Sequence, residues 1–552
     1  MWKNEILLAA TLVMLADCVS GSRGGQKSAA PLTTAEIVVR PSQRIAPISP
    51  YIYGASVEWV ENGNRILDPA SGQLRADIVS LLKPLRLPIL RFPGGILADY
   101  YHWRDAVGPR DKRPKRQNPM DDTTHENNFG TDEFIQLCRA LGAEAIITAN
   151  FGTGTLDETL AWQQYFTDKG FPVKYWEIGN EIYLAENPRP APVPGNDARI
   201  YKTPSQYAAG FREWASALHA KDHNVEIGAI AGTYNTGSQN RDWLSVLLAQ
   251  AAPDADFIAL HDSFAPLILG KYDYADPGKR EEAYLAMFAQ PYFAGEDIHD
   301  VQEKSLAVRN PPSKIAITEH FPLFGGGGGR DQVLAILDQS RTLAAGLYTA
   351  SLFNTYMRNQ VSMATYNLAV SKWFGALVTD TDQGLIRTPT YYVFSLYRNH
   401  MVGDLVFSQV NGPEYSTGRV GTVKARSGVP YLDAVASLDP SRNLELAVIN
   451  RHPSQPVNAR IQVEGASGTV EVTTLTGPSA NAVNGSALSP TVKSGPGDQV
   501  APRTSSWSPG TNGDYTFPPA SLTIFRWSGT MARSGLKHVA PLDRGRHKTE
   551  EQ

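Results

Sequence analysis

The sequence has little cysteine, little net charge and no apolar run long enough to cross a bilayer. Two cysteines, Cys18 and Cys138, occur among 552 residues, and the formal net charge is −4. Because Cys18 lies in a predicted leader, no intrachain disulfide survives processing, and Cys138 is expected to be an inert buried thiol. The pI near 6.3 gives no sign of the basic surface that nucleic-acid binding needs. With 42% hydrophobic residues the chain is expected to bury an apolar core and, at this length, to form two or three domains.

Several motifs for cofactors and metals are also missing. No GxGxxG follows the first strand, so a dinucleotide fold is not indicated. The run Gly325–Gly329 is not followed by Lys-Ser/Thr and is therefore no phosphate loop; we expect a loop over a cleft or an unstructured turn. No His, Cys and Asp residues have the spacing of metal ligands. We expect no cofactor and no metal, and the sequence carries no signal for an oligomeric state.

Residues 1–33 have the pattern of an export leader followed by a flexible linker. An apolar run, Ile6–Ala16, follows one lysine and is too short to span a bilayer. Cys18 is preceded by Leu-Ala-Asp, which resembles a bacterial lipobox, although Asp17 stands where Gly, Ala or Ser is usual. We expect export to the periplasm, to the outer membrane as a lipoprotein or to the medium. Both lipidation of Cys18, the one predicted membrane contact, and simple cleavage between Ser20 and Ala30 fit this pattern.

Between residues 47 and 395 short apolar runs alternate with helical patterns. The alternation predicts a parallel α/β fold, and roughly eight such units favour a (β/α)8 TIM barrel over a doubly wound sheet. Two clear helices are predicted at 128–143 and 156–170. The predicted strands lie at 48–59, 85–95, 144–155, 173–181, 224–232, 256–264, 314–321 and 362–370.

The pattern changes after about residue 396. Residues 444–451, 458–465, 469–477 and 521–527 alternate in the manner of antiparallel strands, without helical patterns between them. We therefore expect a β-sandwich over 396–528. A further strand is predicted at 34–42. The polar tail 529–552 is expected to be disordered.

The stretch WEIGNE contains two candidate catalytic carboxyl groups. Glu181 follows a strand that ends at Gly179-Asn180, and in a barrel the reacting side chains lie at strand ends. Glu177 has the same parity but lies deeper by about 13 Å, at roughly 3.3 Å per residue, so we expect a buried structural charge with a cationic partner. Glu319 follows a second apolar strand. Glycosidic cleavage needs two such carboxyl groups, but many barrels carry strand-end glutamates without a catalytic role.

A series of motifs resembles glycoside hydrolase family 51, the α-L-arabinofuranosidases. The motifs follow the family's order from about residue 35 to 528. The resemblance implies a (β/α)8 barrel at 47–395, followed by a sandwich at 396–528 that also takes an N-terminal strand, 34–46. The motifs are LRFPGGILADYYHWRDAVGPRDKRP (90–114), NNFGTDEF (127–134), ANFGTGTLDE (149–158), KYWEIGNE (174–181), NLAV (367–370), TPTYYVFSLYRNHMVGD (388–404), NAVNG (481–485) and FPPASLTIFRW (517–527).

The resemblance implies the catalytic roles. Glu181 matches the acid/base that follows Asn, and Glu319 matches the nucleophile, although the family more often has Trp or Phe where this chain has His320. The reaction would be retaining hydrolysis by double displacement.

Four further residues match the family's sugar-binding and supporting positions. Asn180 matches the residue that hydrogen-bonds the sugar 2-hydroxyl, and Glu58 matches a carboxylate that holds ring hydroxyls. Arg91 matches the arginine that keeps the nucleophile ionised. His261 matches a strand-end histidine near the acid/base; without the resemblance it would be interpreted as a satisfied polar barrel residue.

The chain departs from the family at sugar contacts. Ile96 stands where Asn is usual and Val370 where Gln is usual, so hydrolysis is better supported than the choice of sugar. The resemblance implies release of terminal α-L-arabinofuranosyl residues from plant-type polysaccharides or oligosaccharides. The alternatives are an endo-β-1,4-glucanase or xylanase, another glycofuranosidase, and a non-catalytic carbohydrate-binding protein.

Overall fold

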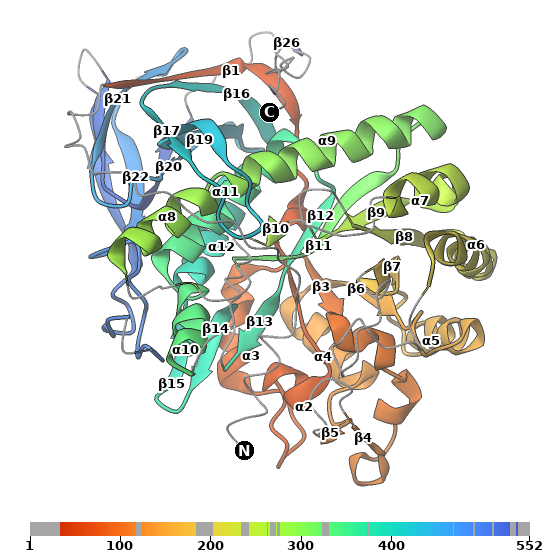
Figure 1. The fold of residues 1–552 in the computed structure, drawn as a ribbon. Helices are drawn as coiled ribbons and strands as arrows, with labels where there is room; N and C mark the ends of the chain where they lie inside the picture. The colour runs from red at the N-terminus through yellow and green to blue at the C-terminus, as the bar shows by residue number, and fades with distance from the viewer. Residues whose placement is uncertain are drawn as a thin grey trace.

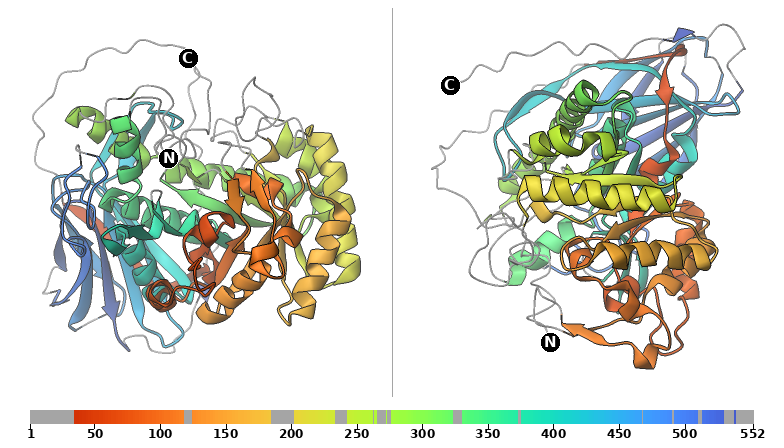
Figure 2. Two further views of the ribbon diagram at one scale, coloured as in Figure 1. Left: turned by 90° about the horizontal axis from the view of Figure 1, so that it is seen from below. Right: turned by 90° about the vertical axis from the view of Figure 1, so that its right-hand side faces the viewer.

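The structure, a computed structural model, consists of a barrel with a β-sheet domain packed beside it (Figure 1). Figure 2 shows the same side-by-side arrangement from two further directions. The residues that the structure describes are 34–117, 124–183, 202–232, 242–261, 263–264, 272, 276–322, 330–372, 375–466, 468–489, 492–509, 513–529 and 537–538. The predicted leader, including Cys18, and the Gly325–Gly329 loop therefore lie outside the described residues. Within the described part, no helix is both long and apolar enough to cross a membrane.

Eight parallel strands of the described chain close into a barrel. The ring closes because β12 pairs with β2 at one seam and β9 pairs with β11 at the other. Most of the strand residues are buried, as expected for strands covered by helices on the outside. This confirms the predicted barrel. The strands are β2 (Gly54–Ser56), β3 (Ile89–Phe92), β6 (Glu144–Ala149), β7 (Tyr175–Ile178), β8 (Glu226–Ala231), β9 (Phe257–Leu260), β11 (Lys314–Phe321) and β12 (Met363–Tyr366).

The first barrel strand is shorter than the sequence suggests. Residues 48–59 were expected to form one strand, but only Gly54–Ser56 pair, and Pro50–Tyr53 form a 3₁₀ turn. Pro50 opens this turn and the Ser49 hydroxyl caps it by accepting the Tyr51 N–H. Local turn chemistry therefore prevails over the alternating pattern.

Helices lie on the outside of the barrel, and α5, α6 and α7 cover one side of it in Figure 1. The two predicted helices are present, and the second begins at a Thr155 cap that accepts the Glu158 N–H. The helices of the described chain are α3 (Ala76–Leu82), α4 (Thr131–Leu141), α5 (Leu156–Asp168), α6 (Pro204–Lys221), α7 (Trp243–Ala251), α8 (Pro277–Met287), α9 (Gln290–Val308), α10 (Arg330–Gln339), α11 (Leu343–Arg358) and α12 (Pro389–His400).

The second domain is a curled sheet that includes the N-terminal strand. β1 (Ala35–Pro47) pairs antiparallel with β16 and parallel with β21, so the expected N-terminal strand is present in this sheet. Strands from both ends of the sheet bury side chains in one core, which gives the sandwich. The other strands are β16 (Asp404–Asn411), β19 (Leu432–Leu438), β20 (Leu444–Asn450), β21 (Val457–Val463), β22 (Val470–Thr476), β23 (Ala501–Trp507), β24 (Asp514–Phe517) and β25 (Ser521–Trp527).

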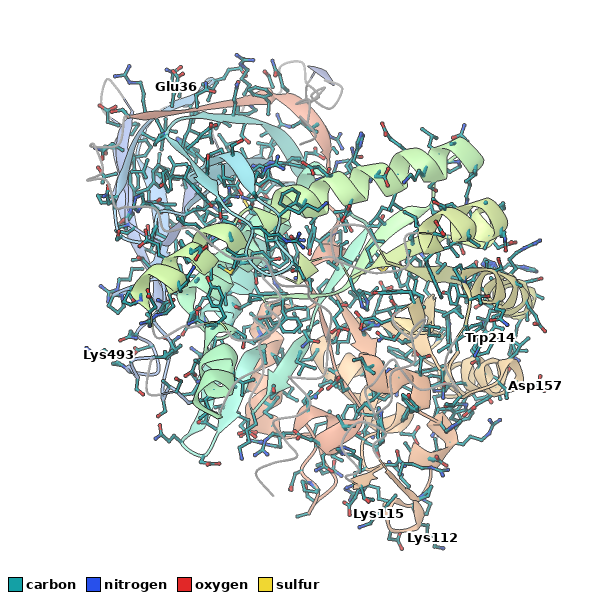
Figure 3. All side chains as sticks on the ribbon, in the orientation of Figure 1. Glu36, Lys112, Lys115, Asp157, Trp214 and Lys493 are labelled. Carbon is teal, nitrogen blue, oxygen red and sulfur yellow. The ribbon has the colours of Figure 1, made fainter. Side chains whose placement is uncertain are left out.

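Both domains also contain short strands besides those of the barrel ring and the main path of the large sheet. Figure 3 shows Lys112 and Lys115 at the end of the molecule that carries the β4–β5 hairpin, far from Glu36 on β1. Within the tail expected to be disordered, β26 (Lys537–His538) pairs with β1; the other tail residues beyond 529 lie outside the described chain. The small strands are β4 (Lys115–Gln117), β5 (Thr124–Glu126), β10 (Ser263–Phe264), β13 (Leu368–Ser371), β14 (Ala376–Thr381), β15 (Gly384–Arg387), β17 (Glu414–Thr417) and β18 (Arg426–Pro430).

A buried ionic network joins the two domains. Asp433 on β19 accepts from Arg358 of α11 at 2.6 Å, from Arg451 at 2.7 Å and from Asn354 of α11 at 2.9 Å. Burial alone would raise the pKa of Asp433, but the two guanidinium groups outweigh it and lower the pKa to about 2. The sandwich is thereby anchored to a barrel helix through the buried Asp433 and Arg451 and the partly exposed Arg358.

Candidate active site

Arg91 is the central cation of the site. It lies on β3, is fully buried, and donates to three residues near the carboxyl ends of other strands. Nη2 lies 2.7 Å from Oε2 of Glu177 and 2.7 Å from Oδ1 of Asn180, and Nη1 lies 3.3 Å from Oε2 of Glu319. The predicted contact between Arg91 and Glu319 is therefore present, and the arginine also joins β7 to β11.

Glu177 is a buried anion with several donors. Besides Arg91, the hydroxyl groups of Thr148 and Thr318 donate to its carboxylate at 2.8 and 2.5 Å. Burial opposes ionisation, but the charge of Arg91, the nearby His261 and the hydroxyl donors together hold the pKa of Glu177 below its ordinary value. Glu177 has no exposed surface, so it is the interior charge with a cationic partner that the sequence predicts.

Glu181 and Glu319 meet at His261. Nδ1 of His261 lies 3.0 Å from Oε1 of Glu181 and 3.9 Å from Oε2 of Glu319, so these two oxygens are separated by at most the sum, 6.9 Å. Retaining glycosidases have carboxyl groups about 5–5.5 Å apart, whereas the range for inverting enzymes begins at about 6.5 Å. The limit for these two oxygens is compatible with the retaining separation and lies near the lower end of the inverting range.

The electrostatic surroundings of Glu319 work against its charge. Burial raises the pKa of Glu319, the nearby carboxylates of Glu181 and Glu177 raise it further, and His261 and Arg91 oppose these effects. The Glu319 side chain keeps 13% of its surface exposed, while Arg91 behind it keeps none. The Glu319 carboxyl group is thus partly open to solvent, and the adjacent Arg91 limits the rise of its pKa.

An irregularity in β11 turns two consecutive side chains toward this site. The pairing of β11 with β12 shifts between Ile317 and His320. Thr318 and Glu319 therefore both face the polar cluster, which strict alternation of side chains forbids. His320 faces the opposite side among aromatic rings, with Tyr356 at 5.4 Å, and burial lowers the pKa of His320 to about 3. Alternation alone could not identify Thr318 as a site residue.

Asp99 connects three loops of the barrel through hydrogen bonds. The sequence did not assign it a role. Its buried carboxylate accepts the backbone N–H of Asn180 at 2.9 Å and of Gly152 at 3.0 Å. Burial raises the pKa of Asp99 to about 7 despite these donors. The only sequence signal was a charged residue within the apolar stretch ILADYY. Asp99 fixes the backbone just before Glu181, which itself has a left-handed φ of 38°.

Glu58 is held by an unusual turn. Residues 61–65 all have positive φ, between 50 and 70°, so the segment labelled α2 (Val60–Asn64) is a left-handed turn. Asn64 in this turn accepts the Glu58 N–H at 2.6 Å and donates to Glu58 Oε2 at 3.1 Å. Burial raises the pKa of Glu58 to about 7. Gly95 lies against Glu58, since a Cβ there would come within 2.6 Å of Oε1.

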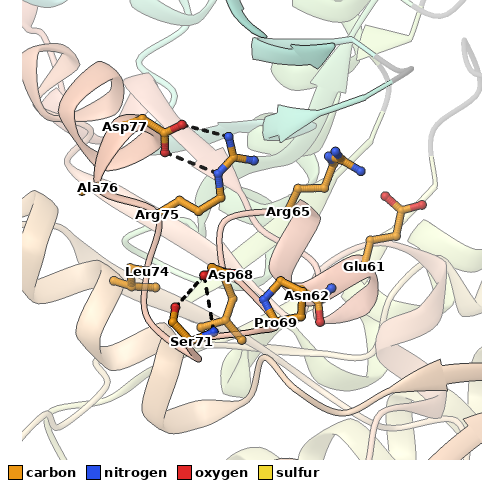
Figure 4. A pocket seen from close by; sticks show the side chains of 11 residues that line it. Glu61, Asn62, Arg65, Asp68, Pro69, Ser71, Leu74, Arg75, Ala76 and Asp77 are labelled. Atoms are coloured by element: carbon orange, nitrogen blue, oxygen red, sulfur yellow. Dashed lines mark hydrogen bonds and ion pairs between the residues drawn. The ribbon is translucent and has the colours of Figure 1, made fainter. Parts of the chain in front are cut away.

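The outer side of the same turn lines a pocket of about 840 Å³ (Figure 4). Arg65 and Arg75 both pair with Asp380 of β14, at 2.6 and 2.7 Å, and Arg75 also binds Asp77. Figure 4 shows the Arg75–Asp77 contact beside the opening. Backbone conformations of this kind cost about 1–2 kcal/mol per residue and persist where surrounding contacts enforce them. The ion pair between Arg65 and Asp380 is one contact that holds the left-handed turn in place.

The two departures from the family pattern differ in accessibility. Ile96 begins a 3₁₀ turn directly after Gly95 and is partly exposed, next to Glu58. Val370 on β13 has no exposed surface and pairs with Val378 of β14. Ile96 can therefore meet a ligand beside Glu58, whereas the expectation that Val370 touches sugar has no support from its burial. Among the described residues, no three His, Cys, Asp or Glu side chains are grouped to hold a metal ion.

Two family descriptions match the chain. The Alpha-L-arabinofuranosidase 1 domain matches residues 81–169, and the Alpha-L-arabinofuranosidase C-terminal domain matches residues 330–521. The first match includes Arg91 and Asp99. The second spans β12 and most of the sandwich.

Similar proteins and structures cover both domains. The probable alpha-L-arabinofuranosidase C of Aspergillus niger is 28% identical over 525 residues, 89% of this chain and 97% of that protein. The intracellular exo-alpha-L-arabinofuranosidase of Bacteroides ovatus is 26% identical over 72% of this chain and 76% of that protein. The GH51 alpha-L-arabinofuranosidase of Thermotoga petrophila has a TM-score of 0.73 and 27% identity, over 90% of this chain and all of that structure. With the ordered motifs and the observed fold, these likenesses establish that the chain belongs to glycoside hydrolase family 51.

Proposed function

We propose that this protein is a retaining α-L-arabinofuranosidase that releases terminal arabinofuranosyl residues from plant-type polysaccharides or oligosaccharides. The observation that carries the proposal is the meeting of Glu181 and Glu319 at one nitrogen of His261, with a separation of at most 6.9 Å. The names of the relatives support the choice of sugar.

In the first step the ionised Glu319 attacks the anomeric carbon of the bound furanose. The bond between that carbon and the leaving oxygen breaks, and Glu181 donates its proton to the oxygen. Arg91, 3.3 Å from Glu319, stabilises the carboxylate before attack. The product of this step is a covalent ester between the sugar and Glu319, with an ionised Glu181 beside it.

In the second step Glu181 acts as a base. Its carboxylate takes a proton from a water molecule, whose oxygen attacks the anomeric carbon and releases Glu319. Asn180 is suited to bind the sugar near this centre: its side-chain nitrogen is buried without a partner among the described residues, while its oxygen accepts from Arg91. Glu58, aimed past Gly95, would hold other ring hydroxyls.

Two alternatives have weaker support. A glucanase-xylanase from a metagenome and a family 44 xyloglucanase share the fold at 14% and 15% identity, which is too low to transfer their substrates. A non-catalytic carbohydrate-binding protein would not need two carboxyl groups and a histidine in contact. The altered position 96 is compatible with each alternative.

A panel of aryl glycosides tests the proposal. We expect kcat/KM to be highest for α-L-arabinofuranosides; a preference for aryl cellobiosides or xylobiosides would favour the endo-acting alternative. Glu319→Ala should lose activity on every substrate, and azide should restore some of it with inverted product. Glu181→Ala should still cleave glycosides whose leaving group needs no proton, and azide should speed its turnover. Complete inactivity of the folded wild-type protein on the panel would refute hydrolysis.

We also propose that residues 1–33 direct export and that Cys18 carries a lipid anchor, because an apolar run and a lipobox-like sequence precede it. The Bacteroides ovatus relative is named as intracellular, so location differs among similar proteins or the leader is specific to this chain. Membrane fractionation and intact mass measure the outcome. A soluble mature protein that begins after residue 18 would refute the anchor.

A further inference from the structure

A chain of hydrogen bonds leads from the buried ion pair to the acid/base. Arg91 binds Glu177, the Thr318 hydroxyl donates to Glu177 at 2.5 Å, Nε2 of His261 lies 2.9 Å from the Thr318 oxygen, and Nδ1 of His261 lies 3.0 Å from Glu181. All five side chains are at least nine-tenths buried. Such a chain has few ways to distribute its protons.

The position of the Thr318 proton follows from its two neighbours. A threonine hydroxyl has one hydrogen to donate, and an ionised carboxylate is the stronger acceptor and can only accept. Glu177 is that carboxylate, since Arg91 and the other donors keep it ionised. The Thr318 oxygen must therefore accept from His261, which requires a hydrogen on Nε2.

The hydrogen on Nε2 decides what happens at the other ring nitrogen. A neutral imidazole with hydrogen on Nε2 has a bare Nδ1, which can only accept, so Glu181 must supply the hydrogen of the 3.0 Å contact. If His261 is instead charged, Glu181 is ionised. The one hydrogen of the contact between Nδ1 and Oε1 is then bonded to Nδ1 of the histidine. The other tautomer, with hydrogen on Nδ1 alone, would favour an ionised Glu181 that has no proton to donate.

We propose that Thr318 is a positioning residue that fixes the Nε2–H tautomer of His261 and so keeps an acidic proton on Glu181. The inference rests on the proposed function of Glu181 as the acid. The described groups that face the histidine include Glu181, Glu319 at 3.9 Å, Glu177 at 4.0 Å and Thr318, and of these Thr318 is the uncharged acceptor beside Nε2. During the reaction the proton leaves Glu181 for the leaving oxygen, and His261 keeps its hydrogen on Nε2.

Thr148 provides a matched control. Its hydroxyl also donates to Glu177, at 2.8 Å, and it is equally buried, but among the described residues this hydroxyl is bonded to Glu177 and not to the histidine. Thr148→Val and Thr318→Val therefore remove one donor from the same carboxylate and the same atoms from the protein. Only Thr318→Val removes the acceptor of the His261 Nε2–H.

The test compares these variants on aryl arabinofuranosides with good and poor leaving groups. In Thr318→Val we expect kcat/KM for poor leaving groups to fall about tenfold to a hundredfold, which is part of the roughly 10²–10⁴-fold that general acid catalysis supplies. Good leaving groups should change little, and the basic limb of the pH profile should move down by about one unit. Thr318→Ser, which keeps the hydroxyl, should restore the wild-type slope against leaving-group pKa, and Thr148→Val should leave that slope unchanged.

Three results would overturn the inference. They are an unchanged slope in folded Thr318→Val, an equal change in Thr148→Val, and an equal loss on all leaving groups. If Thr318→Val does not fold, Thr318→Cys repeats the comparison, because a thiol is a weak acceptor. Inactivity of the wild-type protein on the whole panel would count against the proposed function instead.

The tautomer can also be observed without substrate. The imidazole nitrogen signals of His261, assigned by their loss in His261→Gln, should show hydrogen on Nε2 in the wild-type protein and in Thr148→Val. Thr318→Val should show hydrogen on Nδ1. Hydrogen on Nδ1 in the wild-type protein would refute the inference whatever the activity.

Discussion

Replacing Glu177 by glutamine tests the proposal that Glu177 is the structural and Glu181 the catalytic glutamate of WEIGNE. The change keeps the shape of the side chain but removes the charge that faces Arg91 at 2.7 Å. Two unit charges at about 4 Å interact by about 4 kcal/mol at an effective dielectric constant near 20, and removing one partner of a buried pair costs about 3–5 kcal/mol. We therefore expect Glu177→Gln to lower the stability of the barrel by several kcal/mol, measured as a fall in Tm.

The same variant should remain active and change its pH profile. The charge of Glu177 contributes to the raised pKa of Glu319, so its removal should lower that pKa and move the acid limb of kcat/KM to lower pH. Glu445→Gln is the control, because Glu445 is a buried carboxylate of the sandwich paired with His400; it should change Tm and leave the pH profile alone. Loss of turnover in folded Glu177→Gln, with wild-type rates in Glu181→Ala, would refute the assignment.

Asn64→Gly should keep or raise Tm, because glycine adopts the left-handed turn freely, and it should raise KM, because Glu58 loses both contacts with the Asn64 amide. The control Asn62→Gly relieves the same backbone strain and should leave KM unchanged, so equal KM values in the two variants would contradict the role of the Asn64 amide. Asp433→Asn should lower the free energy of unfolding by about 2 kcal/mol at pH 6 and by almost nothing near pH 2. The pKa of the Asp433 carboxyl is lowered to about 2, so the stabilisation is present above the ordinary aspartate pKa and disappears as the pH falls through 2; a pH-independent difference in Tm would refute this. Ile96→Asn should raise kcat/KM on aryl arabinofuranosides by roughly tenfold, since a lost hydroxyl partner costs about 1–3 kcal/mol; an unchanged value means that the sugar does not reach position 96.

The fold could be predicted to a large extent because its signals are local and repeated. Apolar runs such as 144–149 and 226–231 mark buried strands, and the motif order adds the N-terminal strand to the sandwich. The main error, the length of the strand around residue 54, came from a pattern that a proline-initiated turn interrupts. Glu177, Glu181 and Glu319 could be proposed because each lies near a strand end, and the family motifs, not the spacing, assigned the catalytic roles to Glu181 and Glu319.

The supporting residues could not be predicted because their roles depend on contacts between distant segments. Thr318 faces the site through an irregularity in β11 that the sequence does not indicate. Asp99 binds backbone groups more than 50 residues away in sequence, and Asn64 lies in a run of left-handed residues, which is uncommon for non-glycine residues. Val370 shows the opposite case: its position in the motif suggested contact with sugar, but pairing with β14 buries it.

The most direct test of the central claim is to identify the residue that bonds to the sugar. The protein would be treated with an aryl 2-deoxy-2-fluoro-arabinofuranoside, which slows the second step, and the labelled peptides would be mapped by mass spectrometry. The account predicts one fluorosugar per chain, on Glu319, and no label in Glu319→Gln. A label on Glu181 or Glu177, or steady turnover with inverted product and no label, would contradict it.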